Sequence, residues 1–421
     1  MSGDARTHTV TVPQLAWWGD VETPLTFPKQ FDVKVYRMQG ADAPPLSVEE
    51  IKQAITRPIA SPPLRELARG KKNAVIIFDD MSRPTKVSEI APLVVEELIA
   101  GGLNPNRIEF ICALGGHGAH TAQDFRKKLG PRIVAEFNVY NHNPYDNCTS
   151  VGTTTLGTLV SLNTEFVNAD LKIGIGAIIP HPMSGFGGGP KIVLPGIASV
   201  DTIVHNHRLV RESYARLGIK RGVCSGLTEN NLVLQDMEEA CKISGLDFKI
   251  DVLVNLRRDT VAVFAGKPPE QFHEGIKVAK WHYLTQPIEA PDIVVINCNA
   301  KINETSIAYQ LGLSLIPESG ATLVLLSNNP GGEVTHYLMR QFGETIGGPL
   351  WRRPKLPSSV RKFILMTPYK ERSCADWLAP VEAITWTTNW EQVVAVLSEE
   401  YPTGARVAVV PDATLQYFPA G

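Results

Sequence analysis

The sequence predicts an α/β protein built from two α/β domains. Segment 72–78 is apolar on both faces, which is typical of a buried strand in a parallel sheet, and 107–114 predicts a second strand. Each is followed by a polar or glycine-rich loop and then by a segment with helical spacing, such as 88–102. The same alternation starts again after the proline-bounded segment 287–291, which we interpret as a linker.

The remaining elements follow from local pattern. Residues 9–18 alternate and predict a strand, and Ser47 with Glu50 has the spacing of a capping box, which predicts a short helix. Further strands are expected at 171–179, 249–265 (two strands joined by a turn), 292–297, 321–326, 361–367 and 406–410. Further helices are expected after Thr121, around 205–207, at 227–247, 268–281 and 303–315, from 333 onward, and at 389–401.

At 421 residues the chain is too long for one small core. We expect an N-terminal α/β domain over residues 1–286 and a Rossmann-like C-terminal domain over 292–421, with part of 370–403 packing back on the first domain. Because open α/β sheets bind ligands at the carboxyl ends of their strands, we expect the site in the cleft between the domains.

Composition excludes several classes of function. A net charge of -2 gives no support for nucleic-acid binding. No apolar run is long enough for a membrane span, and the first residues lack the apolar core of a signal peptide. The six cysteines are scattered without a CxxC pair, which suits free thiols in a reducing cytoplasm. We expect a cytoplasmic protein with a small-molecule ligand and neither a nucleic-acid nor a membrane partner.

The most distinctive stretch runs from Pro180 to Gly196. Four glycines fall within residues 185–189, and Lys191 follows them. Glycine lets the backbone approach a ligand closely, and successive N–H groups can form an anion-binding concavity to which a lysine adds charge. The alternative is a tight turn with a surface lysine. The loop matches neither the Walker A pattern nor GxGxxG.

Polar side chains follow both buried strands of the first domain. Asp80 and Arg83 come after the first strand, where Arg83 can clamp a carboxylate or phosphate or simply pair with Asp80. His117 follows the second strand among glycines, exposed for proton transfer, although a lone histidine is more often structural. His120 is a weaker candidate because it lies closer to the next helix.

Histidines also flank the glycine loop. His181 lies between two prolines just before it, and His205 and His207 lie after it on a predicted helix. Residues two apart on a helix point to different faces, so at most one of that pair faces the site. Imidazole suits a divalent metal such as nickel or zinc. Tyr309 and Gln310 are expected to face the cleft from the second domain, or else to be ordinary helix surface.

Together these residues resemble the lactate racemase family, the enzymes that use a nickel pincer nucleotide. The matching residues, in chain order, are Asp80-x-x-Arg83-Pro84, Gly116-His117, Pro180-His181, Gly185-Phe186-x-Gly188-Gly189-x-Lys191, His207 and Tyr309-Gln310. The spacing His-(x)9-Lys-(x)15-His is the most specific part.

The resemblance implies a nickel pincer cofactor, pyridinium-3,5-bisthiocarboxylic acid mononucleotide with bound nickel. Lys191 matches the lysine that tethers this cofactor in the founding enzymes, and His207 matches the nickel ligand. His117 and His181 match the paired acid/base histidines. The remaining matches are Arg83, Tyr309 and Gln310 near the substrate and Asp80, Gly188 and Gly189 near the cofactor.

Three positions depart from the family pattern. Lactate-racemising members carry a lysine where this chain has Leu313, in the expected substrate site. Gly118 replaces the usual arginine after the first histidine, and Gly187 replaces the usual serine in the glycine loop. The resemblance therefore implies a nickel-dependent racemase or epimerase of a 2-hydroxy acid other than lactate.

Two alternatives belong to other classes. One is a non-catalytic nucleotide- or phosphate-binding protein that uses the glycine loop and Lys191. The other is a zinc hydrolase that uses His181 and His207, against which stands the absence of HExxH or a carboxylate at ligand spacing.

Overall fold

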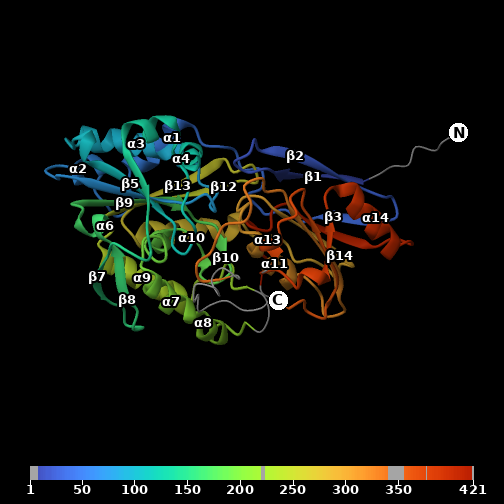
Figure 1. Cartoon of the computed structure of the whole chain (residues 1–421). Helices are drawn as coiled ribbons and strands as arrows, with labels where there is room; N and C mark the ends of the chain where they lie inside the picture. The colour runs from blue at the N-terminus through green and yellow to red at the C-terminus, as the bar shows by residue number, and fades with distance from the viewer. Residues whose placement is uncertain (1–7, 220–222, 340–354, 376, 420–421) are drawn as a thin grey trace.

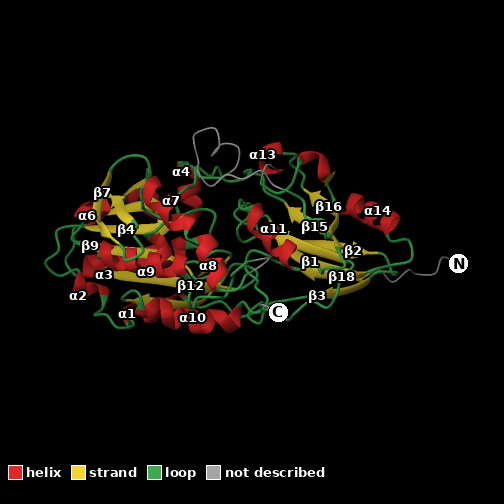
Figure 2. Ribbon diagram, turned by 90° about the horizontal axis from the view of Figure 1, so that it is seen from below, coloured by secondary structure: helices red, strands yellow, loops and turns green. Residues whose placement is uncertain are grey.

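The computed structural model describes residues 8–219, 223–339, 355–375 and 377–419. Two six-stranded sheets form the centres of two lobes, each with helices on both faces (Figures 1 and 2). This confirms the predicted α/β class. No helix within the described ranges combines the length and apolar character needed to cross a membrane.

The first sheet has the strand order β13-β12-β9-β4-β5-β6 and is parallel except for β13. Its strands are β4 (Ala74–Asp79), β5 (Ile108–Ala113), β6 (Asn138–Asn141), β9 (Leu171–Ala177), β12 (Phe248–Val254) and β13 (Thr260–Gly266). Small antiparallel pairs are β7 (Cys148–Thr153) with β8 (Leu159–Asn163), and β10 (Pro180–His181) with β11 (Gly185–Phe186).

Alternating side chains of this sheet build two separate cores. Ile76 and Phe78 of β4 pack in one cluster, while Val75 and Ile77 pack in the other. The helices of the first cluster are α1 (Val48–Thr56), α2 (Leu64–Leu67), α3 (Val87–Ala100), α4 (Ala122–Leu129), α5 (Pro131–Glu136) and α10 (Glu270–His282). Those on the other side are α6 (Thr164–Asn168), α7 (Val200–Arg208), α8 (Val210–Arg216) and α9 (Leu232–Ser244). Short 3₁₀ turns occur at η1 (Pro105–Arg107) and η2 (Gly189–Ile192).

The second sheet is wholly parallel, with the order β17-β16-β15-β14-β18-β3. Its strands are β3 (Asp32–Val35), β14 (Ile293–Cys298), β15 (Ala321–Ser327), β16 (Val360–Met366), β17 (Ile384–Thr387) and β18 (Arg406–Val410). One face is covered by α11 (Thr305–Ser314) and α13 (Arg372–Ala375), and the other by α14 (Trp390–Glu400) with the hairpin β1 (His8–Gln14) and β2 (Val21–Phe27). A 3₁₀ turn, η3 (Val381–Ala383), precedes β17.

The beginning of the chain belongs to the second lobe, which differs from the predicted division at residue 286. β3 pairs in parallel with β18, the last strand, and Val12 and Phe27 of the hairpin pack in the core under α14. In Figure 1 these blue strands lie beside the red α14. The sequence prediction failed here because strand pairing depends on partners nearly four hundred residues away.

Two of the segments that pass between the lobes lie side by side; a third, the tail after β18, packs Leu415 and Tyr417 in the core of the first lobe. The first follows β3 and the second follows α10; they meet in an isolated bridge between Met38 and Thr285 and in a hydrogen bond from the Gly40 N–H to the His282 carbonyl. A change in the relative position of the lobes therefore has to bend both connecting segments together.

Two predictions for the second lobe differ from the structure. Residues 333–339 form turns and a bridge rather than the expected helix, and 340–354 lie outside the described residues. Within 370–403, α14 packs in the core of the second sheet rather than on the first lobe, because its residues Trp390, Val393 and Leu397 face that sheet. Among the described residues of this stretch, Trp377, before η3, reaches the cavity described next.

Candidate active site

A cavity lies where the carboxyl ends of the two sheets face each other. The empty space within it and in front of it totals about 970 Å³, part of which is open solvent. The first sheet contributes the loops after β4, β5 and β9, and the second contributes the first turns of α11. Eight of the residues singled out from the sequence line it: Asp80, Arg83, His117, His181, Gly188, Lys191, His207 and Gln310. Their roles remain predictions, but the structure brings them together.

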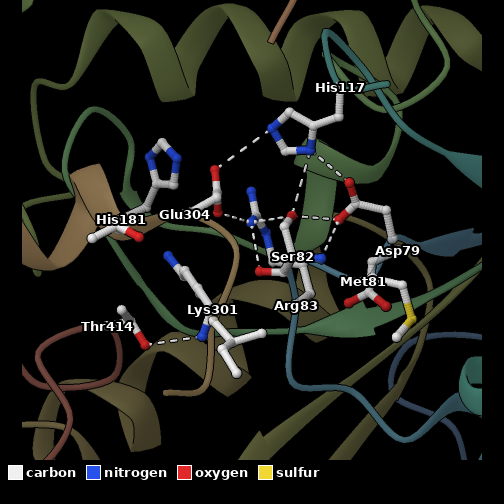
Figure 3. Close-up of polar contacts among 12 residues, drawn as sticks. Asp79, Met81, Ser82, Arg83, His117, His181, Lys301, Glu304 and Thr414 are labelled. Carbon is white, nitrogen blue, oxygen red and sulfur yellow. Dashed lines mark hydrogen bonds and ion pairs between the residues drawn. The ribbon is translucent and has the colours of Figure 1, made fainter. Parts of the chain in front are cut away.

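His117 lies between two carboxylates. Its Nδ1 is 2.5 Å from Oδ2 of Asp80, and its Nε2 is 3.5 Å from Oε1 of Glu304 (Figure 3). Burial alone would lower the pKa of His117, but Asp80 and then Glu304 raise it to about 9. Ser82 supports this arrangement because its backbone N–H and its hydroxyl both donate to Asp80. His117 is therefore an imidazolium near neutral pH, poised to give up a proton.

His181 has the opposite character. Burial, and then the positive charge of Lys191, hold the pKa of His181 well below its ordinary value, so its ring is neutral. The Ser184 hydroxyl lies 3.1 Å from Nδ1 and 2.8 Å from the carbonyl of Phe186, so it can donate to that carbonyl and accept from Nδ1–H. The backbone N–H groups of Met183 and Ser184 also point at Nδ1, at 3.3 and 3.4 Å. These two donors need the lone pair of Nδ1 and favour the tautomer with its proton on Nε2, whereas the tautomer with a proton on Nδ1 relies on Ser184 alone and leaves Nε2 as a base.

Arg83 forms the bridge between the lobes at this site. Its NH1 is 2.5 Å from Oε2 of Glu304 and also donates to the carbonyl and hydroxyl of Ser82. Glu304 comes from the second lobe, immediately before α11, and both side chains are largely buried. Glu304 has no distinctive signal in the sequence, because an acid at the start of a helix is an ordinary stabilising feature.

Two lysines lie at or beside this cavity. Lys191 lines the cavity, and burial, then the charge of Arg83, lowers its pKa to about 7. Lys301, fully buried, is affected in the same order and also has a pKa of about 7; its Nζ donates to the carbonyl of Pro180, directly before His181. A lysine with such a pKa is substantially unprotonated at neutral pH and can act as a nucleophile.

The structure distinguishes His205 from His207 on α7. Nδ1 of His205 is 2.7 Å from the hydroxyl of Thr158, on the side of β8. His207 lines the cavity, and burial lowers its pKa to about 3, so the imidazole is neutral, the form that binds metals. Its Nδ1 faces the carbonyl of Ile203 one turn earlier but forms no hydrogen bond of good geometry.

The protein alone does not build a complete metal centre. Among the described residues, no three His, Cys, Asp or Glu side chains are grouped to hold a metal ion. His207 supplies one neutral imidazole, so a metal here needs further ligands from a bound group. This donor set fits a metal carried by an organic cofactor and disfavours the zinc-hydrolase alternative, which needs three protein ligands.

The glycine loop does not form the anion-binding concavity that its sequence suggested. The N–H of Gly187 donates to the carbonyl of Ile179, and the N–H of Gly189 donates to the buried carboxylate of Asp251. Glycine is needed for packing instead. A Cβ on Gly188 would lie 2.6 Å from the carbonyl oxygen of Ala177, and one on Gly189 would lie 2.3 Å from the ring of Phe272. Gly189 therefore supports the loop but does not line the cavity.

Tyr309 and Leu313 are also placed differently from expectation. Tyr309 packs in the core of the second lobe with its ring 5.0 Å from that of Phe363, and Leu313 packs against the same hydrophobic cluster. Neither residue lines the cavity, whereas Gln310 does. Helical geometry explains Tyr309, since adjacent residues differ by about 100° in direction on a helix. Leu313 lies nearly on the face of Gln310 but one turn further along α11, where it packs against the core of the second lobe.

A third histidine joins the site from the second lobe. His336 lines the cavity with its ring 5.3 Å from that of His117. It arrives there because the N–H of Gly118 donates to the carbonyl of Thr335 and the N–H of Tyr337 donates to the carbonyl of Gly116. A Cβ on Gly118 would lie 3.1 Å from Cβ of Thr335, so glycine at this position allows the close pairing. No local sequence signal identifies His336.

Comparisons with known proteins agree with this picture. Residues 18–218 match the family model of the lactate racemase N-terminal domain. Two relatives are lactate racemases. The one from Thermoanaerobacterium thermosaccharolyticum is 32% identical over 277 residues, which are 63% of this chain and 63% of the relative. The one from Lactiplantibacillus plantarum is 30% identical over 291 residues, which are 68% of this chain and 64% of the relative. The matched regions thus span less than two thirds of either relative.

Structural superposition matches a larger part of the chain than the sequence comparisons do. The structure of the lactate racemase apoprotein from Thermoanaerobacterium thermosaccharolyticum superimposes with a TM-score of 0.72 at 22% identity, covering 98% of this chain and 100% of that one. A Thermotoga maritima protein superimposes with a TM-score of 0.66 at 16% identity, covering 89% and 99% of the two chains. At these identities the structural matches establish the fold alone.

Proposed function

This chain belongs to the lactate racemase family, and from that premise we propose that it is a racemase or epimerase of a 2-hydroxy acid. The observation that carries the proposal is the pair His117 and His181 in one cavity, one imidazole protonated and the other neutral. Inversion at a hydroxyl-bearing carbon needs one group to take the hydroxyl proton and another to return a proton to oxygen on the opposite side.

The cavity residues fit the nickel pincer nucleotide of the family. Lys191 would form the covalent tether and His207 would bind nickel as a neutral imidazole, with Gly188 leaving room beside them. When bound, this group would supply a hydride acceptor for the hydrogen on C2.

The protein groups handle the proton and the orientation of the substrate. Nε2 of His181 takes the hydroxyl proton as C2 loses its hydride and becomes the planar carbon of a 2-oxo acid. His117 gives its Nε2 proton to that oxygen when hydride returns to the other face. One inversion therefore exchanges the protonation states of the two histidines. Arg83 and Gln310 line the cavity from opposite lobes and orient the bound acid.

The leading alternative is a protein that binds a nucleotide or phosphate without catalysis. It would use the glycine loop, but two of the loop's N–H groups are already bonded to Ile179 and Asp251. It would also leave the opposed protonation states of His117 and His181 without a role. The site geometry therefore favours the racemase.

The test is racemisation by protein produced together with the enzymes that make the cofactor. Metal analysis and intact mass first establish that the protein is loaded. Single enantiomers of 2-hydroxy acids with aliphatic, aromatic and polyhydroxy substituents are then followed by chiral chromatography. We expect both enantiomers to appear for at least one acid and turnover to fall at least about a hundredfold in His117→Gln and His181→Gln. Loaded protein that inverts none of these acids contradicts the proposal.

A further inference from the structure

The turn after His181 surrounds one nitrogen of its ring with three polar groups. The backbone N–H groups of Met183 and Ser184 point at Nδ1 from 3.3 and 3.4 Å, and the Ser184 hydroxyl lies 3.1 Å away. Among the described residues, no other group forms a hydrogen bond with Nδ1, and none forms one with Nε2. Because His181 lines the cavity, Nε2 is the ring nitrogen that is available to a bound ligand.

The three groups around Nδ1 do not favour the same tautomer. The two backbone N–H groups can only donate, so they require an unprotonated Nδ1 and leave the ring proton on Nε2. A hydroxyl has one hydrogen to donate and can also accept. The Ser184 hydroxyl has the carbonyl of Phe186 as an acceptor 2.8 Å away, and when its hydrogen is used there, its oxygen can accept from Nδ1–H. Within the described chain, Ser184 is therefore the group that can stabilise the tautomer with an unprotonated Nε2.

The turn is held in place from outside, which fixes these groups relative to the ring. The hydroxyl of Tyr214 donates to the carbonyl of Pro182 at 2.8 Å, and Nδ2 of Asn231 donates to the carbonyl of Met183 at 3.0 Å. Ser184 itself is fully buried, so bulk water does not reach its hydroxyl. The hydrogen bond between Ser184 and the ring is thus not replaced by one to solvent.

The other histidine of the proposed pair has the same arrangement with a charged partner. Nδ1 of His117 lies 2.5 Å from Oδ2 of Asp80. A carboxylate orients the ring and also stabilises an added proton, whereas a hydroxyl orients the ring without adding charge. Against the effect of burial, Asp80 raises the pKa of His117 to about 9. Burial, and then Lys191, hold the pKa of His181 well below its ordinary value, and no described carboxylate lies at ion-pair distance to oppose them. A serine partner therefore suits a histidine that has to stay neutral and act as a base.

We propose that Ser184 is a positioning residue for the reaction: by accepting a hydrogen bond from Nδ1–H of His181, it makes available the tautomer whose Nε2 can take the hydroxyl proton of the substrate. This inference rests on the proposed racemase function and states what its base requires. Without the hydroxyl, the two backbone donors keep the ring proton on Nε2. His181 can then donate to a substrate oxygen but cannot remove a proton from it.

NMR of unloaded protein with nitrogen-15 in its histidines measures the tautomer directly. At neutral pH the His181 ring is neutral, and the shifts of its two nitrogens report which one carries the proton; His181→Gln identifies the signals. We expect the proton on Nδ1 in the wild type and on Nε2 in Ser184→Ala. Ser184→Thr keeps a hydroxyl and should resemble the wild type. A wild-type ring with its proton on Nε2, or one tautomer shared by the wild type and Ser184→Ala, overturns the inference.

The matched control is Tyr214→Phe, which removes another hydroxyl from the same turn but no contact to the ring. It should keep the wild-type tautomer, and a change as large as that in Ser184→Ala would show that the tautomer follows general loosening of the turn and would overturn the specific role of Ser184. Thermal unfolding establishes that each variant is folded. If Ser184→Thr is not, the comparison of the wild type with Ser184→Ala still decides.

Turnover separates this inference from the proposed function. In loaded protein, Ser184→Ala should lower kcat about tenfold or more with little change in KM, because the substrate contacts remain while the base is rarely in the required tautomer. If the loaded wild type inverts acids and Ser184→Ala inverts them equally fast, the positioning role is overturned. If the loaded wild type inverts no acid, the racemase proposal fails, and the NMR measurement still decides whether Ser184 sets the tautomer.

Discussion

Replacing Asp80 with asparagine isolates the electrostatic support of His117. Oδ2 of Asp80 lies 2.5 Å from Nδ1 of His117, and both side chains are buried. Asparagine keeps the size and an oxygen acceptor but removes the charge. Burial by itself lowers the pKa of His117, and Asp80 is the strongest group that raises it. We therefore expect the pKa of His117 to fall from about 9 to its ordinary value or below in Asp80→Asn.

The size of the effect follows from that change. A rise from 6.5 to about 9, at ~1.4 kcal/mol per pH unit, amounts to about 3 kcal/mol of folding free energy. Because the folded state holds the proton more tightly, this contribution is fully present below pH 6.5 and is lost as pH rises through about 9. Lys191 and Lys301, whose pKa values are lowered to about 7, favour folding as pH rises. Their effect largely cancels in the difference between the two proteins.

The assay is urea unfolding of both proteins, without cofactor, at a series of pH values. The difference in free energy of unfolding should shrink by about 3 kcal/mol between about pH 6 and pH 9.5. Titration of the His117 ring signal by NMR in the same two proteins measures the pKa directly. A difference that stays constant with pH would show that Asp80 acts only through its neutral hydrogen bonds, for example with Ser82, and would refute the electrostatic account.

Three further predictions concern the loop and the metal. Peptide mapping of loaded protein should show an adduct on the peptide that contains Lys191, and an unmodified peptide in fully active protein would exclude a covalent tether. His207→Ala should lose nickel while His205→Ala retains it, by metal analysis, because His205 is bonded to Thr158; the reverse pattern would contradict the assignment. Gly189→Ala should lower the free energy of unfolding by ~1–3 kcal/mol, because its Cβ would lie 2.3 Å from a ring carbon of Phe272 at a φ of +50°. Gly187→Ala, whose nearest neighbour would be 3.7 Å away, is the matched control and should change much less.

Local patterns predicted the parts of the site that belong to the first sheet. The apolar runs that became β4, β5 and β9 placed Asp80, His117 and His181 directly after strand ends. Because the carboxyl ends of parallel strands lie at one edge of the sheet, those three residues are expected at that edge even when the loop conformations are unknown. Their convergence was therefore predictable without a structure.

The parts contributed by the second lobe could not be predicted in this way. Glu304 resembles any acid at the start of a helix, and His336 lies in a segment for which a helix was expected. Both acquire their place from contacts across the lobes, with Arg83 and with the turn at Gly116. In the glycine loop, the N–H of Gly189 is bound by Asp251, a buried side chain on a strand distant in the sequence. No spacing within the loop indicates such a partner.

The pairing of β3 with β18 has a consequence for the order in which the protein is made. Asp32 lies opposite Arg406, so this edge strand has to wait for a neighbour that is synthesised long after it. The first sheet holds only strands from Ala74 to Gly266, so it can assemble on the ribosome while that early segment is still without its sheet. Pairing two strands that lie so far apart in the sequence is slow. The wall of the cavity that carries Glu304 is thus expected to form after the first sheet, and the site to appear only once β18 has been made.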